Sequence, residues 1–173
     1  MSTKLLKNIT LLFVIGTLLS GLPVNAQGTV VRVAPAAAAV VQGATVAITI
    51  QIDNVSNLFG AEVHLTFDPA LIEVVDADVN TAGTQIGHGG FLSPDFVARN
   101  EVNQAAGTID YAISQMPNHA AATGSGVLAT ITFRGKSAGS SAVAITTALL
   151  ADSNGAGITA ATVNGTIQVT ASG

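Results

Sequence analysis

The clearest pattern in the chain is a strict alternation of apolar and polar residues from Ala61 to Phe67. The polar positions of this alternation are Glu62, His64 and Thr66. A period of two is typical of a strand with one buried side and one solvent-facing side. Asp68 and Pro69 follow, and proline has no N–H for a strand ladder, so the strand is predicted to end there. We expect the side-chain oxygen of Asp68 to cap this corner.

Similar apolar runs recur along the chain between Gly, Asn, Asp and Pro residues, and they predict further strands. These lie at residues 29–33, 44–53, 71–75, 108–114, 127–133, 142–150 and 162–170. The alanine-rich residues 36–41 are too few for an isolated helix and are interpreted as a connection or an edge segment. Residues 54–58 contain turn-forming Asn and Ser and are predicted to form a loop.

Residues 76–103 show the weakest pattern and predict a long loop with one short strand inside it. Four scattered apolar residues are expected to anchor this loop: Phe91, Leu92, Phe96 and Val97. In total the chain predicts about eight or nine short strands and no amphipathic helix. The predicted fold class is therefore all-β, an antiparallel sandwich or jelly roll.

Residues 1–26 have the layout of a secretory signal peptide. Lys4 and Lys7 precede an apolar run, and the small residue Ala26 precedes the expected cleavage point. The run is short for a membrane-spanning helix, although an uncleaved anchor is an alternative. We therefore predict a secreted, extracellular protein with no membrane span after cleavage, and one domain at residues 27–173.

Composition narrows the function further. Two of the six basic residues lie in the leader, so the mature chain has four basic and ten acidic residues, and its net charge is −6. Four scattered cations cannot follow a phosphate backbone, so we expect no nucleic-acid partner. The chain has no cysteine, so the secreted domain must be held by its hydrophobic core. A mature chain of about 150 residues is long enough to bury roughly two-thirds of its surface.

Four segments of the chain resemble a cohesin domain: residues 42–48, 58–75, 107–112 and 124–133. The second contains Phe67-Asp68-Pro69, and the fourth reads Gly-Ser-Gly-Val-Leu-Ala-Thr-Ile-Thr-Phe. These two motifs are moderately specific together, and either alone would be weak. Residues 165–169 are similar to the closing strand of the family. The resemblance covers nearly the whole mature chain.

The resemblance implies a nine-stranded jelly-roll sandwich without catalytic activity, related to certain carbohydrate-binding modules. In that family one sheet face binds dockerin modules of cellulosome-type assemblies. The implied function is a secreted binding module that recognises a dockerin-type partner and is linked to extracellular polysaccharide degradation. The matching positions are the predicted partner-binding residues: Glu62, His64, Thr66, Asp110, Ser114 and Gln115.

Glu62 and His64 are expected about 7 Å apart on one strand face, at two residues' rise. They could form a polar docking patch, or they could be ordinary solvated residues, and the sequence leaves both interpretations open. Acid–base catalysis by this pair is disfavoured because no nucleophile or orienting group lies near it in the sequence. We therefore expect that the chain is not an enzyme.

Three aspartates could supply oxygen ligands for a structural calcium ion: Asp53, Asp76 and Asp78. Nothing in the sequence brings them together. Residues 152–155 begin like a calcium loop but lack its later ligands. His88 and His119 lack zinc-ligand spacing and are expected in exposed loops. No metal and no cofactor is predicted.

Direct binding of polysaccharide is the rival function, and a structural role at a cell surface is a third. Sugar-binding surfaces usually present aromatic rings. The chain has no Trp, and its single Tyr, Tyr111, lies on an inward parity together with Phe67 and Phe133. Only Phe59, Phe91 and Phe96 remain as exposed candidates, so a flat aromatic strip is poorly supported.

Overall fold

The computed structural model describes residues 28–173, and the predicted signal peptide lies outside these residues. In chain order the strands are β1 (Val30–Ala34), β2 (Ala37–Val41), β3 (Thr45–Thr66), β4 (Ile72–Val74), β5 (Gly87–His88), β6 (Phe96–Asn103), β7 (Thr108–Ser114), β8 (Ala122–Gly135), β9 (Gly139–Asp152), β10 (Gly157–Ile158), β11 (Ala161–Val163) and β12 (Gly165–Thr170). Within residues 28–173 no helix is long and apolar enough to cross a membrane.

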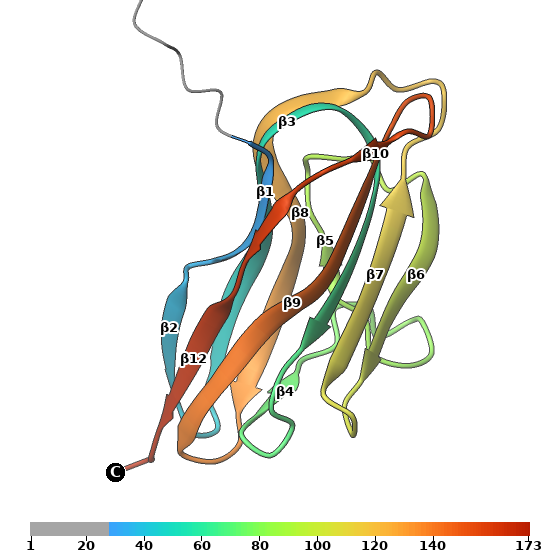
Figure 1. The fold of residues 1–173 in the computed structure, drawn as a ribbon. Coiled ribbons are helices and arrows are strands. Elements are labelled where there is room, and N and C mark those ends of the chain that lie inside the picture. The colour runs from blue at the N-terminus through green and yellow to red at the C-terminus, as the bar shows by residue number, and fades with distance from the viewer. Residues whose placement is uncertain (1–27) are drawn as a thin grey trace, which may run out of the picture.

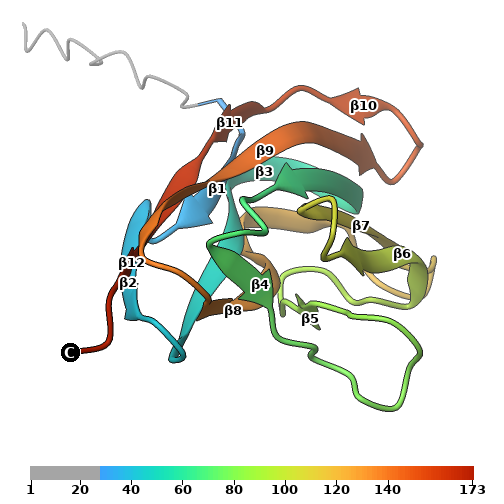
Figure 2. The ribbon, with the colours of Figure 1, turned by 90° about the horizontal axis from the view of Figure 1, so that it is seen from below.

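The strands form two layers that face each other across the core (Figure 1). One layer holds β1, the first part of β3, β8, β4 and β5. The other holds β2, β12, β9, the second part of β3, β7 and β6. Figure 2 shows β8 and β5 across the core from β9 and the end of β3. The predicted all-β, jelly-roll sandwich is confirmed, and most of its strand pairs are antiparallel.

Strand β3 belongs to both layers. Residues 45–52 pair with β8 and residues 60–66 pair with β7 and β9. The prediction of a loop at residues 54–58 is wrong. This segment is part of β3 and pairs with β8 at Val55 and Leu58, with a register shift before each of them. Asn54 and Asn57 have positive φ values of 55° and 61°. Asparagine tolerates this conformation, so the expected turn residues instead form bulges that bend the strand from one layer into the other.

Residues 76–103 contain more strand than the pattern predicts. The structure has β5 and also the eight-residue β6, which pairs with β7. Leu92 is buried as expected, but Phe96 and Val97 are exposed. Strand β6 lies at the edge of its layer, where most of its side chains contact solvent. Without one fully buried side, the strand has no alternation to detect.

The core is built from the inward parity of these strands. Ala61, Val63, Leu65 and Phe67 are all buried, as the alternation predicts. The ring of Phe67 packs edge-on against Phe133 from β8, with centroids 5.4 Å apart, and so joins the two layers. This packing fixes the parity of β3, because a slip of one residue would turn every apolar side chain outward.

Two smaller expectations are also confirmed. The N–H of Ala70 donates to Asp68 Oδ1 over 2.9 Å, so Asp68 caps the corner before Pro69. Residues 37–41 form β2, an edge strand that pairs with β12 in parallel register.

Candidate functional site

The candidate site is the outward side of four neighbouring strands, β9, β3, β7 and β6, which we call the four-strand face. Its residues are Thr147, Leu149, Gly60, Glu62, His64, Thr66, Thr108, Asp110, Ala112, Ser114, Phe96, Arg99 and Glu101. Because opposite residues of an antiparallel pair point to the same side, the register brings these residues into cross-strand rows. The core holds the backbone of the face from behind.

The centre of the face is a hydrogen-bonded row of Glu62, His64 and Asp110. His64 on β3 lies opposite Asp110 on β7. Its Nδ1 lies within hydrogen-bond reach of Asp110 Oδ1, and its Nε2 lies 2.7 Å from Glu62 Oε1. When the imidazole is protonated, both of its N–H groups donate to a carboxylate. The row thus joins two strands through one histidine.

The two carboxylates change the titration of His64. The hydrogen bond to Asp110, followed by the hydrogen bond to Glu62, raises the pKa of His64 above its ordinary value of 6.5. Partial burial opposes this shift, because desolvation disfavours the charged form. The imidazole therefore keeps its proton to a higher pH than a free histidine does.

Strand β6 adds two charged residues that the sequence did not point to. Arg99 Nη1 lies 3.8 Å from Asp110 Oδ2, and Glu101 lies directly opposite Asp110. Neither residue stands out in the sequence, because residues 76–103 predict only one short strand within a long loop and give no pairing for it. The motif around Thr108 to Ser114 marked Asp110, but its neighbours come from a strand whose pairing only the fold reveals.

One end of the face is hollowed and apolar. This hollow has a volume of about 280 Å³ and lies over Gly60 and Ala112, with Phe96 and Leu149 on either side. Phe96 and Leu149 are 57% and 59% exposed and border the same hollow, so they form an exposed apolar patch. Gly60 has no side chain to fill the floor. We call this feature the apolar hollow.

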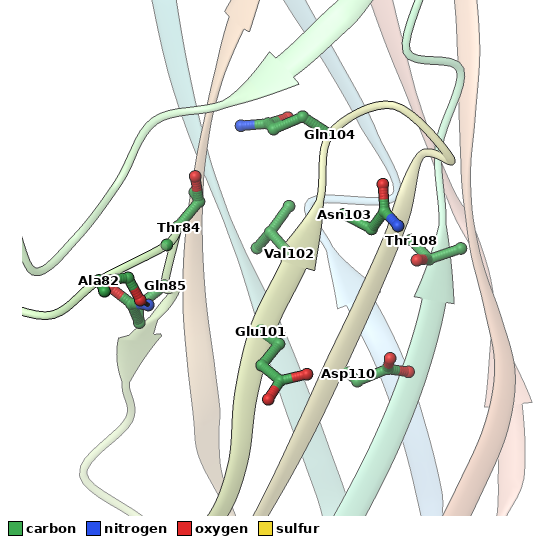
Figure 3. A pocket seen from close by; sticks show the side chains of 10 residues that line it. Ala82, Thr84, Gln85, Glu101, Val102, Asn103, Gln104, Thr108 and Asp110 are labelled. Atoms are coloured by element: carbon green, nitrogen blue, oxygen red, sulfur yellow. Dashed lines mark hydrogen bonds between the residues drawn. The ribbon is translucent and has the colours of Figure 1, made fainter.

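The other end of the face borders a larger polar hollow of about 550 Å³. Figure 3 shows Glu101 and Asp110 side by side on neighbouring strands, with Thr108 further along and residues 82–85 across the hollow. Gly107 forms the turn that begins β7, at φ 67°, and its N–H donates to Asn103 O over 2.9 Å. A side chain there would meet Phe67 O at 2.2 Å, so only glycine allows this approach.

The structure brings together five of the six predicted partner-binding residues: Glu62, His64, Thr66, Asp110 and Ser114. Gln115 does not join them. It is only 6% exposed, and its amide binds two loops, donating to Ala120 O over 2.9 Å and accepting from Ser93 N–H over 3.2 Å. Strand β7 ends at Ser114, so the parity that turns Ser114 outward turns Gln115 inward.

The three carboxylates considered for calcium each have hydrogen-bond or ion-pair partners of their own. Asp53 pairs with Arg32, whereas Asp76 Oδ1 accepts the N–H groups of Asp78 and Gln85. Among residues 28–173 no group of three or more potential ligands is arranged to hold a metal ion. His88 is exposed, but it lies in strand β5 and not in a loop as expected, and its Nδ1 lies 2.8 Å from the buried Tyr111 hydroxyl.

The Glu62–His64–Asp110 row is suited to binding and not to acid–base chemistry. Both imidazole nitrogens are occupied by carboxylates, so neither is free to take a proton from a substrate. Of the aromatic residues in the described part of the chain, Phe96 alone is classed as exposed, and Phe59 and Phe91 are partly covered. The face therefore offers no flat row of rings for a sugar chain.

The fold and this face define a class of protein, an all-β jelly-roll binding module that presents one side of a sheet. A family model described as "Cohesin domain" matches residues 31–169. The chain belongs to the cohesin domain family, and the resemblance seen in the sequence is confirmed. Cohesin domains are non-catalytic binding modules, so this chain is not an enzyme.

Solved structures agree on the fold. A non-cellulosomal cohesin from the archaeon Archaeoglobus fulgidus is 21% identical, with a TM-score of 0.66 over 83% of this chain and 92% of that one. A type II cohesin domain from the cellulosome of Acetivibrio cellulolyticus is 20% identical, with a TM-score of 0.69 over 82% and 95%. A type I cohesin–dockerin complex from Clostridium thermocellum is 14% identical, with a TM-score of 0.68 over 83% and 100%. A search of curated protein sequences found no match.

Proposed function

We propose that this chain binds a dockerin-type protein module on its four-strand face. One observation carries the proposal: an exposed sheet face combines an apolar hollow at one end with a hydrogen-bonded polar row at its centre. Protein interfaces combine apolar contacts that exclude water with polar groups that fix the register of the partner. Membership of the cohesin family supports the same partner class.

The mechanism is rigid display. Phe67 and Phe133 hold the two layers together behind the face, and β3 continues from one layer into the other. A partner therefore meets side chains whose backbone is already fixed, and little ordering cost accompanies binding. The contacts proposed at the polar row are Glu62, His64 and Asp110, with Thr66 and Ser114 beside them on the face.

The proposal is tested by measuring the affinity of the folded domain for purified dockerin modules by calorimetry. We expect the double variant Glu62→Ala/His64→Ala to weaken binding more than tenfold, because it removes the centre of the polar row. Its thermal unfolding should be nearly unchanged, since both side chains are partly exposed. Equal losses of binding and stability would show that these residues serve the fold.

A matched control is Glu73→Ala/Arg134→Ala. It removes an exposed ion pair of 3.1 Å in the opposite layer, so binding should not change. If the domain is retained on insoluble polysaccharide and binds no dockerin module, the proposal is wrong and direct sugar binding is the function.

We also propose that the protein is exported and serves the extracellular degradation of polysaccharide. The leader pattern of residues 1–26 supports export, and the cellulosomal origin of cohesins with the same fold supports the setting. Amino-terminal sequencing of the protein from the culture medium should begin at Gln27. Recovery of the intact chain from the cells alone would contradict export.

A further inference from the structure

We propose that strand β2 is a self-association edge, at which two copies of the chain pair their β2 strands in antiparallel register. Ala39 of one copy lies opposite Ala39 of the other, and the two layers that contain β2 join into one continuous sheet. This inference does not depend on the dockerin proposal, because β2 and β6 lie at opposite edges of their layer.

Strand β2 has an open backbone edge. Within residues 28–173 it pairs with β12 alone, and Figures 1 and 2 show it at the margin of the molecule. The N–H of Thr166 on β12 donates to Ala36 O, and the N–H of Gln42 donates to the end of β12, so the even-numbered residues face β12. Backbone groups alternate in direction along a paired strand. The N–H and C=O groups of Ala37 and Ala39 therefore point away from β12.

The other edges of the sandwich carry devices that prevent pairing with a second chain. At β4, the amide of Gln104 accepts from Val74 N–H over 3.1 Å and donates to Val74 O. Beside β6, the side chain of Asn100 bonds both the N–H and the C=O of Ile86, and β6 also carries charged side chains. Strand β11 has only three residues. Cover, charge and shortness are the usual means of blocking an edge strand, and β2, with five uncharged residues, has none of them.

The charge distribution favours a second copy as the occupant of this edge. The mature chain has a net charge of −6, so two copies repel each other on average. Residues 33–52, 137–151 and 153–173 contain no charged side chain, and they include β2, β12 and nearly all of β9. Two copies that meet at β2 therefore keep their carboxylates apart. A charged peptide would find no complementary charge there.

The register follows from the two-fold symmetry of the pair. Opposed residues of an antiparallel pair whose backbone groups face each other exchange two hydrogen bonds. Ala39 is the middle residue of β2, so its pairing with its own copy uses the whole strand and places Ala37 opposite Val41 of the other copy. Val41 is 48% exposed, and it loses apolar surface to the second copy in this arrangement.

The contact is small, and this sets its strength. One pair of five-residue strands is a limited interface, and interfaces below about 1,200 Å² are typical of weak complexes. We therefore expect a dimer that forms at high protein concentration and dissociates on dilution.

The first test is analytical ultracentrifugation of residues 27–173 at concentrations up to about 1 mM. We expect a reversible monomer–dimer equilibrium. Ala39→Lys places two ammonium groups opposite each other and should weaken the dimer at least tenfold. Ala39→Pro removes an N–H that β12 does not use, so it should abolish the dimer and leave the fold intact. If Ala39→Pro unfolds the domain, Ala39→Lys decides.

The matched control is Ala142→Lys. Ala142 is exposed on the same side of the sheet but lies two strands from the edge, in the row of Ala37. It adds the same charge to each copy and should leave the dimer nearly unchanged. A protein that stays monomeric at the highest concentration would overturn the inference, as would equal losses in Ala39→Lys and Ala142→Lys.

A distance measurement tests the register. Ser140, Gln168 and Ala39 form one exposed cross-strand row, which continues into the second copy of the proposed dimer. The two Ser140 positions are then five strand spacings apart, about 24 Å. The chain has no cysteine, so Ser140→Cys accepts a single nitroxide label, and pulsed electron spin resonance gives the distance. A much longer main distance, or a signal that Ala39→Lys does not reduce, would overturn the inference.

Discussion

His64 shows how one side chain acquires its role from a strand far away in the sequence. Its neighbour Glu62 is visible in the alternating pattern, but the larger influence on its pKa is the hydrogen bond to Asp110, which is 46 residues away. Register decides this pairing, because a shift of one residue would place Ile109 or Tyr111 opposite His64. The polar row is therefore a property of the sheet.

We predict that His64 titrates above pH 6.5 and that Asp110→Asn lowers this pKa more than Glu62→Gln does. The reason is that Asp110 makes the larger contribution to the raised pKa. The measurement is an NMR titration of the His64 ring in the three proteins. A larger effect of Glu62→Gln would show that Glu62, and not Asp110, contributes more to the raised pKa of His64.

The same shift predicts the sign of a pH effect on stability. A group with a raised folded-state pKa contributes stability that is fully present below its unfolded pKa, here 6.5, and is lost as pH rises through the folded pKa. The stability difference between the wild-type protein and His64→Gln should therefore shrink above pH 6.5. Denaturant unfolding at several pH values checks this, and a difference that grows with pH would contradict it.

At the scale of elements, β3 organises the sandwich because it is a member of both layers. Its second half alternates strictly, so its buried parity is set by the sequence, while Asn54 and Asn57 bend it between layers. The same bend aligns Glu62 and His64 with β7. Because β3 both joins the two layers and carries Glu62 and His64, the geometry of the face depends on the packing of the core.

Leu65→Ala is predicted to destabilise the domain by about 2–5 kcal/mol, because a fully buried leucine is replaced and a cavity remains. The matched variant Thr66→Ala lies next to it on the outward side and should change stability by less than about 0.5 kcal/mol. Denaturant unfolding of both variants measures the contrast. Similar losses in the two variants would mean that the parity of β3 is not as described.

At the scale of the whole molecule, stability comes from the core, since the chain has no disulfide. Loop carboxylates are satisfied by their own turns. The Thr81 hydroxyl and the Asn80 backbone N–H hold the pKa of Asp78 below its usual range. The N–H groups of Ala156 and Asn154 do the same for Asp152. These oxygens already have partners within their own loops.

We therefore predict that a chelator such as EDTA leaves the melting temperature unchanged, and that added calcium does not raise it. A ligand that binds only the folded state would stabilise it by mass action, so calorimetry with and without calcium is a direct measurement. A rise of several degrees that follows calcium concentration would reveal a site that these loops do form.

The sequence by itself determined the fold class, the parity of the central strand, the corner at Asp68 and the family. Each rests on local information: a period of two, a proline, a set of motifs. It also marked five residues that share one face, because parity alone turns them outward. The prediction failed to place Gln115, because this residue lies one position past the end of β7 and is buried.

Only the tertiary structure decided which outward residues meet. Strand β6 has no buried side to give a pattern, so Arg99, Glu101 and the exposed Phe96 could not be assigned to the face from the sequence. Asn54 and Asn57 favour a turn locally, but pairing with β8 resumes at Val55 and Leu58 after register shifts, so the chain bends instead of turning back. Cross-strand neighbours depend on the register between strands that lie far apart in the sequence. Local periodicity gives no information about this long-range pairing.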